Sequence, residues 1–573
     1  MSAPSPVTRP EYHWVLFASL AALAITCLPY LLGWSLETEE QAFGGCIFLA
    51  DDCYSYLAKM QRAAQGEWLL QMPYTPEPHA RTLIYVFYVL LGKLAALTGL
   101  STVATYHATR VLLGLGLLLT AYRFLAEFTP RLAVRRVAWL MVTFGGGLGW
   151  LLVALGQSNW LGGPPLDFYL PEGFAFLVLL GFPHLAAAQS LLLWGLLLLL
   201  KAWGKSTTSK VPSPTSNTQR PSHASRFTFH VSRLTFDASR FTLPAAGAGV
   251  CWLTMGLVVP FYVAVAWAVT GAACLALALR ERRVPWREGV LAGLAALISA
   301  PAVAYSAWVF THDRVYATWA AQNLILSPHP LHYLAAYGAP LLLAAFAVRE
   351  AWREEGPAWL PLAWVAVAPL LIYLPFNLQR RLVEGAQVPL SLLAAWGAAR
   401  LWHLGKSTIP HRLFKPVLIR RCIVAALLAT MLPTSLILLI GSSGWMFARP
   451  APIFRDRAEI AALDWLAGRT QPNDAILTAY DTGTYLPVRV GARVFLGHGL
   501  ETVDADGKEA MVTRFFGAAP EDSWKEWLLA EYGVDYVFWG PAERALGDFD
   551  PNQAPYLKQV YDAGGYRVFE VKQ

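Results

Sequence analysis

Two adjacent aspartates offer the clearest chemistry in this 573-residue sequence. Asp51 and Asp52 follow the apolar segment 14–34 and precede an amphipathic segment. A carboxylate at such a place carries a desolvation cost unless something offsets it. It can take a proton from a sugar hydroxyl, or the pair can hold a divalent cation such as Mg²⁺ or Mn²⁺. Asp is also a favoured N-cap, so an equally good interpretation is that one of the two caps the next helix.

A second acidic group, Asp167 and Glu172, lies shortly before Pro183 and His184. If it faces the same side of a membrane as Asp51, the two carboxylate clusters can share one substrate or one metal ion. Ordinary solvation of a loop is the simpler alternative. His184 follows a proline at the start of an apolar segment, which is more typical of a helix-terminal hydrogen-bonding residue than of a metal ligand.

The third candidate group is Gln379, Arg380 and Arg381, between the apolar segments 357–375 and 384–402. Counting of membrane crossings places this loop outside, where arginines run against the positive-inside bias. The guanidinium fork matches a phosphate, so these residues are candidates for holding a lipid-phosphate headgroup. A salt bridge with Glu384 or contact with an outer-leaflet phospholipid is the alternative.

Apolar segments must position these groups, and the chain is rich in the hydrophobic residues that form such segments. Hydrophobic residues make up 56% of the chain and charged residues 14%, against about 25% charged in soluble domains. Segments of about 20 apolar residues are long enough to span a bilayer. Twelve candidate spans can be read at 14–34, 83–100, 104–125, 137–156, 184–200, 244–258, 261–279, 288–308, 331–348, 357–375, 384–402 and 421–441.

The charge distribution orients these spans. From Gly441 onward there are 19 acidic and 13 basic residues, and before it 19 acidic and 32 basic residues. Basic loops collect on the cytoplasmic side, which places the N-terminus in the cytoplasm and the acidic tail outside. An odd number of crossings is then required. Either 83–100 is a re-entrant or interfacial helix, or 244–279 is one helix interrupted near Pro260. The first choice fits the charges better and gives about eleven spans.

The chain is therefore expected to be a polytopic α-helical protein of the plasma (inner) membrane. Its membrane domain covers residues 1–442, with a first external loop at 35–82. Because the basic residues occur in short runs between apolar helices, nucleic-acid binding is not expected. The Ser-, Thr- and Pro-rich stretch 206–243 predicts a disordered cytoplasmic linker. Cys46 and Cys53 share the first loop and can form a disulfide if that loop faces an oxidising compartment.

Residues 443–573 predict an extracytoplasmic α/β domain. Helical periodicity at 457–468, 508–516 and 524–532 alternates with strand-like runs at 475–479, 494–496, 534–538 and 566–571. Such alternation favours a small sheet covered by helices. No phosphate-binding glycine fingerprint occurs, and the run 481–484 after a strand is a weak hint of a ligand-facing loop.

The order of these features resembles the GT-C superfamily of membrane glycosyltransferases that use polyprenyl-phosphate sugars. This family includes protein O-mannosyltransferases and the aminoarabinose transferase of lipid A. The resemblance covers about residues 14–447 and rests on short motifs at Asp51–Tyr56, Gly66–Trp68, Tyr106–Arg110 and Gln379–Arg381. The Lys-Pro-Pro element of many aminoarabinose-transferase relatives and the Trp-Trp-Asp motif of oligosaccharyltransferases are missing from the sequence.

The resemblance implies an inverting transfer of a single sugar from a polyprenyl phosphate to an acceptor hydroxyl on a glycan, lipid or protein. Asp51 or Asp52 would be the base or a metal ligand, Asp167 or Glu172 the second acidic position, and Arg380 and Arg381 the phosphate-binding pair. Two other classes stay open from the sequence. These are a transporter or flippase, and a non-catalytic membrane scaffold with an external binding domain.

Overall fold

The computed structural model describes residues 7–204, 223–353, 356–403, 414–517 and 521–572. The chain forms two compact units, each assembled from segments that are distant in sequence. The first unit comprises Met1–Ile25, Val111–Tyr305 and Ile325–Leu438. The second comprises Thr26–Arg110, Ser306–Leu324 and Leu439–Gln573. The second unit therefore combines the first loop of the sequence with its C-terminal segment.

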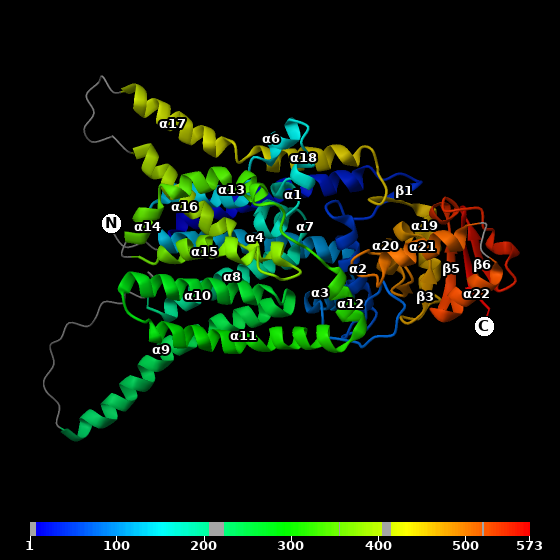
Figure 1. Cartoon of the computed structure of the whole chain (residues 1–573), viewed down its shortest axis with the longest axis horizontal. Helices are drawn as coiled ribbons and strands as arrows, with labels where there is room; N and C mark the ends of the chain where they lie inside the picture. The colour runs from blue at the N-terminus through cyan, green and yellow to red at the C-terminus, as the bar shows by residue number, and fades with distance from the viewer. Residues whose placement is uncertain (1–6, 205–222, 354–355, 404–413, 518–520, 573) are drawn as a thin grey trace. The chain divides into compact units, whose positions relative to one another are not determined.

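The first unit consists of helices, most of which are labelled in Figure 1. They are α1 (Arg9–Ser35), α4 (Thr102–Phe128), α5 (Leu132–Phe144), α6 (Gly149–Ala154), α7 (Ala175–Gly181), α8 (Pro183–Ala202), α9 (His223–Val258), α10 (Tyr262–Glu281), α11 (Trp286–His312), α13 (Pro330–Ala345), α14 (Val348–Arg353), α15 (Trp359–Leu371), α16 (Gln387–His403), α17 (Phe414–Ala429) and α18 (Pro433–Met446), with α1, α4, α11 and α18 continuing into the second unit. Short 3₁₀ turns η2 (Leu166–Phe168), η3 (Pro171–Gly173) and η5 (Gln379–Val383) connect some of them.

Within the described residues, seven helical stretches are long and apolar enough to cross a membrane. They are Arg9–Ser35, Thr102–Phe128, Pro183–Ala202, Arg240–Val258, Tyr262–Glu281, Trp286–His312 and Leu418–Met446. The predicted spans at 137–156, 331–348, 357–375 and 384–402 are shorter helices of 13 to 17 residues. A helix rises about 1.5 Å per residue, so a 13-residue helix is shorter than the bilayer core. The count of eleven spans therefore stays a prediction.

Two structural details bear on the choice of the non-crossing segment. The predicted segment 83–100 contains α3 (Val86–Thr98), a helix of only 13 residues. Segment 244–279 is divided into α9 and α10, and the break falls beside Pro260. Because other predicted spans are equally short helices, the choice of the non-crossing segment stays a prediction. Of the predicted linker 206–243, residues 206–222 lie outside the described residues, and from His223 the backbone is helical as part of α9.

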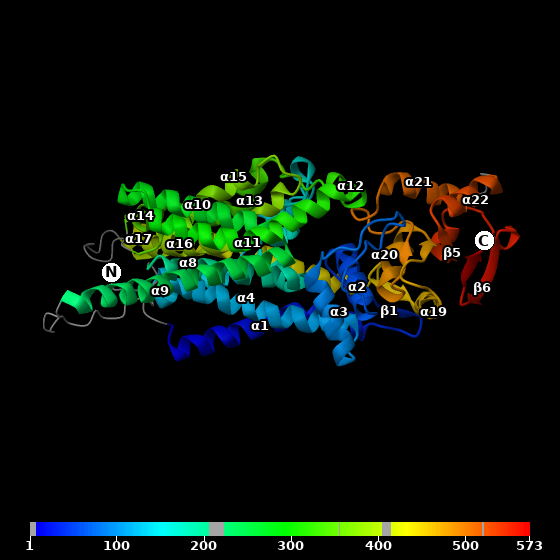
Figure 2. The ribbon, with the colours of Figure 1, turned by 90° about the horizontal axis from the view of Figure 1, so that it is seen from below.

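The helices of the first unit pack through large buried rings. Helices α8, α10, α15 and α16 run side by side in both Figure 1 and Figure 2. Trp139, Trp252, Trp359 and Trp364 are all less than 2% exposed. A buried ion pair also joins two helices, because Arg135 of α5 lies 2.8 Å from Glu11 of α1. Burying such wide aromatic surfaces supplies the contact area that holds helices together where water is excluded.

The second unit is built around a mixed sheet of five strands in the order β4-β3-β5-β7-β6. β3 pairs in parallel with β4 and β5, whereas β7 pairs antiparallel with β5 and β6. The strands are β3 (Ala475–Leu477), β4 (Arg493–Val494), β5 (Val534–Trp539), β6 (Leu557–Ala563) and β7 (Tyr566–Val571), and a separate antiparallel pair joins β1 (Gln41–Phe43) to β2 (Phe454–Asp456). The helices are α2 (Ala50–Ala64), α3, α12 (Arg314–Gln322), α19 (Arg457–Ala467), α20 (Tyr480–Arg489), α21 (Ala505–Phe516), α22 (Asp522–Glu531) and α23 (Pro541–Arg544).

The two faces of this sheet are buried under different helices. Successive side chains of a strand point to opposite faces, and here Ile476 and Leu477 of β3 belong to separate cores. The core around Leu477 includes side chains from α21 and α22. The core around Ile476 includes α19, α20 and α2, and Figure 2 shows α2 beside α20. A helix of the first loop is thereby part of the core of the C-terminal sheet.

Candidate active site

The two aspartates lie in the first turn of α2. The residue that caps this helix is Leu49, whose backbone is left-handed (φ 47°) and which makes no side-chain cap. The interpretation of Asp51 or Asp52 as the N-cap is therefore wrong, because the turn begins one residue earlier than the acidic pair. Helix N-termini carry a partial positive charge, so both carboxylates are stabilised there even though neither caps the helix.

The loop before α2 is held tightly. Cys46 and Cys53 form a disulfide that closes the loop onto the helix. At Gly44 a Cβ atom would overlap the hydroxyl of Tyr54, a side chain with no exposed surface. At Gly45 the backbone is left-handed (φ 85°), and a Cβ atom would overlap Val103. Only glycine fits both positions, and the acidic pair is consequently presented on a fixed turn.

Each aspartate meets a residue of the C-terminal segment. The Tyr480 hydroxyl donates to Oδ2 of Asp51 over 3.2 Å, and it also accepts from the backbone N–H of Gly499. The Nε2 atom of His498 lies 3.2 Å from Oδ1 of Asp52. His498 side-chain exposure is 7%, whereas that of Asp52 is 28%. Asp52 is therefore the member of this pair that solvent or a substrate can reach.

A buried ion pair lies two turns further along α2. The Lys59 ammonium donates to both oxygens of Glu501 over 2.8 Å, and the Ser55 hydroxyl donates to Glu501 over 2.6 Å. The Tyr85 hydroxyl lies 3.3 Å from the same carboxylate. Lys59 is 1% exposed and Glu501 is 4% exposed. Burial raises the pKa of Glu501, but Lys59 and His498 outweigh burial and hold the pKa below its usual range.

The first unit contains the arginine group. Arg381 pairs with Glu172 over 3.4 Å, whereas the sequence suggested the neighbouring Glu384 as a partner. The Arg380 guanidinium lies 4.9 Å from the ring centre of Tyr169 and donates to its hydroxyl over 3.3 Å. The Glu172 side chain is 6% exposed and Arg381 is 30% exposed. This arrangement leaves the Arg381 guanidinium accessible while one carboxylate orients it.

The remaining predicted residues of the first unit support backbone turns. Asp167 is 2% exposed and accepts from the Thr434 hydroxyl (2.7 Å) and from the N–H groups of Gly147 (2.9 Å) and Gly149 (3.3 Å). The Gln379 amide lies within hydrogen-bonding distance of Leu374 and Ser327. His184 occupies the first turn of α8, where it is 9% exposed and packs edge-on to Phe182.

The predicted residues thus form two groups. Asp51 and Asp52 belong to the second unit, together with Tyr480, His498 and Glu501. The first unit holds the other six predicted residues, Asp167, Glu172, His184, Gln379, Arg380 and Arg381. Among these six, the structure joins Glu172 to Arg381 by an ion pair.

The two aspartates are also candidate ligands for a metal ion. Among the described residues, no group of three or more His, Cys, Asp or Glu side chains is arranged to hold a metal ion. Asp51 and Asp52 contact different partners, Tyr480 and His498, rather than converging on one point. These residues do not fit a resident cation, and a cation that arrives with the substrate stays a prediction.

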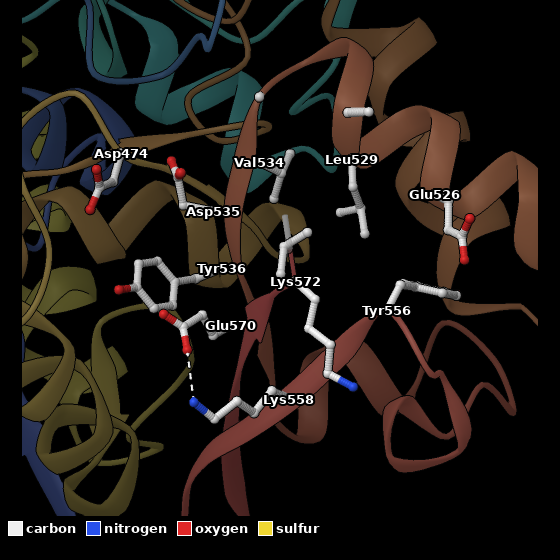
Figure 3. Close-up of a pocket in the computed structure, with 13 residues that line it drawn as sticks. Asp474, Glu526, Leu529, Val534, Asp535, Tyr536, Tyr556, Lys558, Glu570 and Lys572 are labelled. Atoms are coloured by element: carbon white, nitrogen blue, oxygen red, sulfur yellow. Dashed lines mark hydrogen bonds and ion pairs between the residues drawn. The ribbon is translucent and has the colours of Figure 1, made fainter.

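A concave surface away from the aspartates lies at one end of the C-terminal sheet, with a volume of about 990 Å³. Figure 3 shows Asp474 and Asp535 on one side of it and Lys558 paired with Glu570 on another, the latter over 3.5 Å. Tyr556 and α22 close the far side. No residue predicted as functional lines this concavity, and its polar groups are engaged in strand-end contacts such as that of Asp535 with the Ala475 N–H.

Sequence reasoning missed His498, Glu501, Lys59 and Tyr480. The only signal in the sequence was the predicted strand 494–496, which His498 and Glu501 follow, since polar residues just beyond the end of a strand often line binding or catalytic sites. The run 481–484 was taken as a weak ligand-facing loop. It forms the first turns of α20, where Thr482 and Thr484 are buried, and the adjacent Tyr480 is the residue that reaches Asp51.

The architecture can be compared with known proteins. No protein-family model and no curated protein matches the sequence. Solved structures do match over the whole chain. Archaeal oligosaccharyltransferase AglB from Archaeoglobus fulgidus, in complex with an inhibitory peptide and a dolichol-phosphate, superposes with a TM-score of 0.51 at 13% identity. That match covers 99% of this chain and 75% of AglB.

The chain has a GT-C fold. The arabinofuranosyltransferase AftD from Mycobacteria supports the same assignment, with a TM-score of 0.51 at 16% identity over 100% of this chain. The chain spans 42% of the length of AftD. Because both matches cover at least 99% of this chain, the GT-C fold includes the C-terminal segment that supplies Tyr480 and His498.

Proposed function

We propose that this chain is a membrane glycosyltransferase that moves a single sugar from a polyprenyl-phosphate donor to an acceptor hydroxyl. The observation that carries the proposal is the partly exposed acidic pair in the first turn of α2, with Asp52 beside His498, in a chain with a GT-C fold. AglB, which has the same fold, is recorded with a dolichol-phosphate and a peptide. That record supports a lipid phosphate and an acceptor as the two substrates.

The proposed reaction is a displacement at the anomeric carbon. The acceptor oxygen forms a bond to that carbon while the bond from the carbon to the phosphate oxygen breaks, and the polyprenyl phosphate leaves with the electron pair. Asp52 takes the hydroxyl proton, because it is the more accessible partner of the Asp52–His498 pair. One base and no covalent intermediate give inversion of configuration. A positioned base of this kind contributes about 10²- to 10⁴-fold in rate.

The departing phosphate is assigned to Arg380 and Arg381. Negative charge builds on this group as the sugar leaves, and fixed cations stabilise it most effectively where water is excluded. Glu172 orients Arg381, and Tyr169 accepts a hydrogen bond from Arg380 and lies beside its guanidinium. The proposed acceptor is a glycan, lipid or protein hydroxyl, and Asp51, which accepts a hydrogen bond from Tyr480, is the proposed contact for it beside Asp52.

The proposed location of the site is the extracytoplasmic side of the plasma (inner) membrane, with the N-terminus in the cytoplasm. The disulfide between Cys46 and Cys53 supports it, because disulfides persist in oxidising compartments. Membrane-impermeant labelling of single cysteines introduced beside Asp506 and beside Arg282 tests the orientation. Labelling of both positions from the same side would contradict it.

Activity is tested with polyprenyl phosphates that carry one radiolabelled hexose, pentose or aminopentose, in vesicles containing the full chain. Asp52→Asn is expected to lose about 10²-fold or more of transfer, and Asp51→Asn a smaller factor. Asp506→Asn is the matched control, since Asp506 is an exposed aspartate in the first turn of α21. Full activity in both Asp51→Asn and Asp52→Asn would refute the proposal. Transfer that a chelator abolishes and Mg²⁺ or Mn²⁺ restores would assign the pair to a cation instead.

A further inference from the structure

His498 lies behind Asp52 as seen from solvent. Its Nε2 atom faces Oδ1 of Asp52 at 3.2 Å, and its ring centre lies 5.8 Å from that of Tyr74. The other ring nitrogen, Nδ1, is buried and makes no hydrogen bond in the structure. The His498 side chain is 7% exposed and that of Asp52 is 28% exposed, so Asp52 is the more accessible member of the pair. A His–Asp pair in this orientation places the carboxylate, not the imidazole, at the reacting side.

We propose that His498 is a positioning residue that keeps Asp52 ionised and oriented, so that the C-terminal segment completes the site for proton transfer. The inference rests on the proposed role of Asp52 as base. It goes beyond that role by assigning the C-terminal segment a direct part in setting the protonation of the site. Under the rival arrangement His498 would be the base and Asp52 its orienting partner, but the buried Nδ1 atom leaves no nitrogen for a substrate.

The charged groups around His498 support a positive imidazole. Asp52 and Lys59 face it from α2, and Glu501 faces it from the loop after β4. Asp51 lies next to Asp52, and the neighbouring phenols are Tyr74 and Tyr480. With His498 protonated, the two cations balance Asp52 and Glu501. Burial lowers the pKa of His498, yet the hydrogen bond that His498 donates to Asp52 and the charge of Glu501 bring the pKa above its usual value.

The test measures the protonation of Asp52 without any sugar donor. Dicyclohexylcarbodiimide reacts with protonated carboxyl groups, so the pH dependence of its labelling at Asp52, mapped by peptide mass spectrometry, reports the pKa of Asp52. His498→Gln keeps an amide N–H where Nε2 stands and removes the charge. Because a neighbouring cation lowers a carboxyl pKa by about 1 to 3 units, the labelling midpoint is expected to rise by that amount. The full chain in nanodiscs is used throughout.

Two variants give the comparison its controls. His312→Gln makes the same change at an exposed histidine of the second unit and is expected to leave the midpoint unchanged. His498→Leu removes both charge and hydrogen bond, and a rise at least as large as that of His498→Gln is expected. An unchanged Asp52 midpoint in His498→Gln overturns the inference, whereas a purely structural role would lower stability without moving the midpoint.

A double-mutant cycle of Asp52→Asn and His498→Gln on thermal unfolding covers the case in which Asp52 is not labelled. A raised folded pKa means that the stabilisation by His498 is fully present below its unfolded pKa, about 6.5, and is lost as pH rises through the folded value. Coupling is therefore expected at pH 6 and not at pH 9.5, and its absence at pH 6 overturns the inference. The proposed function fails separately, if Asp52→Asn retains full transfer activity.

Discussion

Replacing Lys59 by methionine tests whether the buried ion pair behind the acidic turn is essential to the second unit. The ammonium lies 2.8 Å from Glu501, and both side chains are at most 4% exposed. At an effective dielectric constant of about 20, two unit charges at this distance attract by about 6 kcal/mol. Part of this attraction offsets the cost of removing the ions from water. Loss of one partner leaves a buried, uncompensated charge, which costs about 3–5 kcal/mol.

Hydrogen exchange of the α2 amides in the full chain is the assay, because it reports the local opening of this helix directly. Lys59→Met is expected to accelerate exchange across α2 by about 10²- to 10³-fold. The double variant Lys59→Met, Glu501→Gln should recover at least half of the loss, since no unpaired carboxylate then remains. Lys558→Met is the matched control, because Lys558 is 63% exposed in its pair with Glu570 and exposed pairs contribute less than about 1 kcal/mol.

Two results would refute this reasoning. If Lys59→Met exchanged no faster than Lys558→Met, the pair would not stabilise α2. If the double variant were as unstable as Lys59→Met alone, the loss would come from packing of the lysine stem and not from the stranded carboxylate. Either result would also weaken the argument for charge balance around His498.

Three further changes have expected outcomes. Replacing Cys46 and Cys53 by serine should destabilise the turn before α2 by about 2.5 kcal/mol. Local hydrogen exchange should then be faster in this variant than in the original chain with its disulfide formed; equal exchange would mean that the glycines alone hold the loop. Arg381→Gln should weaken binding of undecaprenyl phosphate about tenfold or more, with Glu172→Gln giving a smaller loss, and native mass spectrometry in lipid mixtures measures both; unchanged binding would remove the phosphate assignment. Asp167→Ala should lower thermal stability by about 3 kcal/mol because three buried donors lose their acceptor, whereas Asp167→Asn should cost less; equal effects would show that packing dominates.

The sequence predicted the acidic turn because residue type and place carry that information locally. Asp51 and Asp52 stand out as a charged pair beside apolar segments, and α2 begins beside them as expected. The strands at 475, 494, 534 and 566 were likewise readable from alternation, and each overlaps a described strand. Local periodicity was enough for these elements.

The partners of the aspartates were not predictable in the same way. His498 is separated from Asp52 by 446 residues, and Tyr480 from Asp51 by 429. No spacing rule operates over such distances, so only the folded sheet and the packing of α2 on its face reveal the pairing. The number of spans also resisted prediction, because helices of 13 to 17 residues have the composition of a span but not its length.

The packing of α2 against α20 and the C-terminal sheet has a consequence for biosynthesis. The apolar face of α2 is made early in translation, yet the surface that covers Tyr54 and Leu57 is made only after the last membrane helix has been synthesised. Until then α2 exposes an apolar surface near the membrane. Contacts between segments so far apart in the sequence also form slowly. A chain truncated before residue 470 should therefore be retained by chaperones or degraded rather than accumulate as a membrane domain.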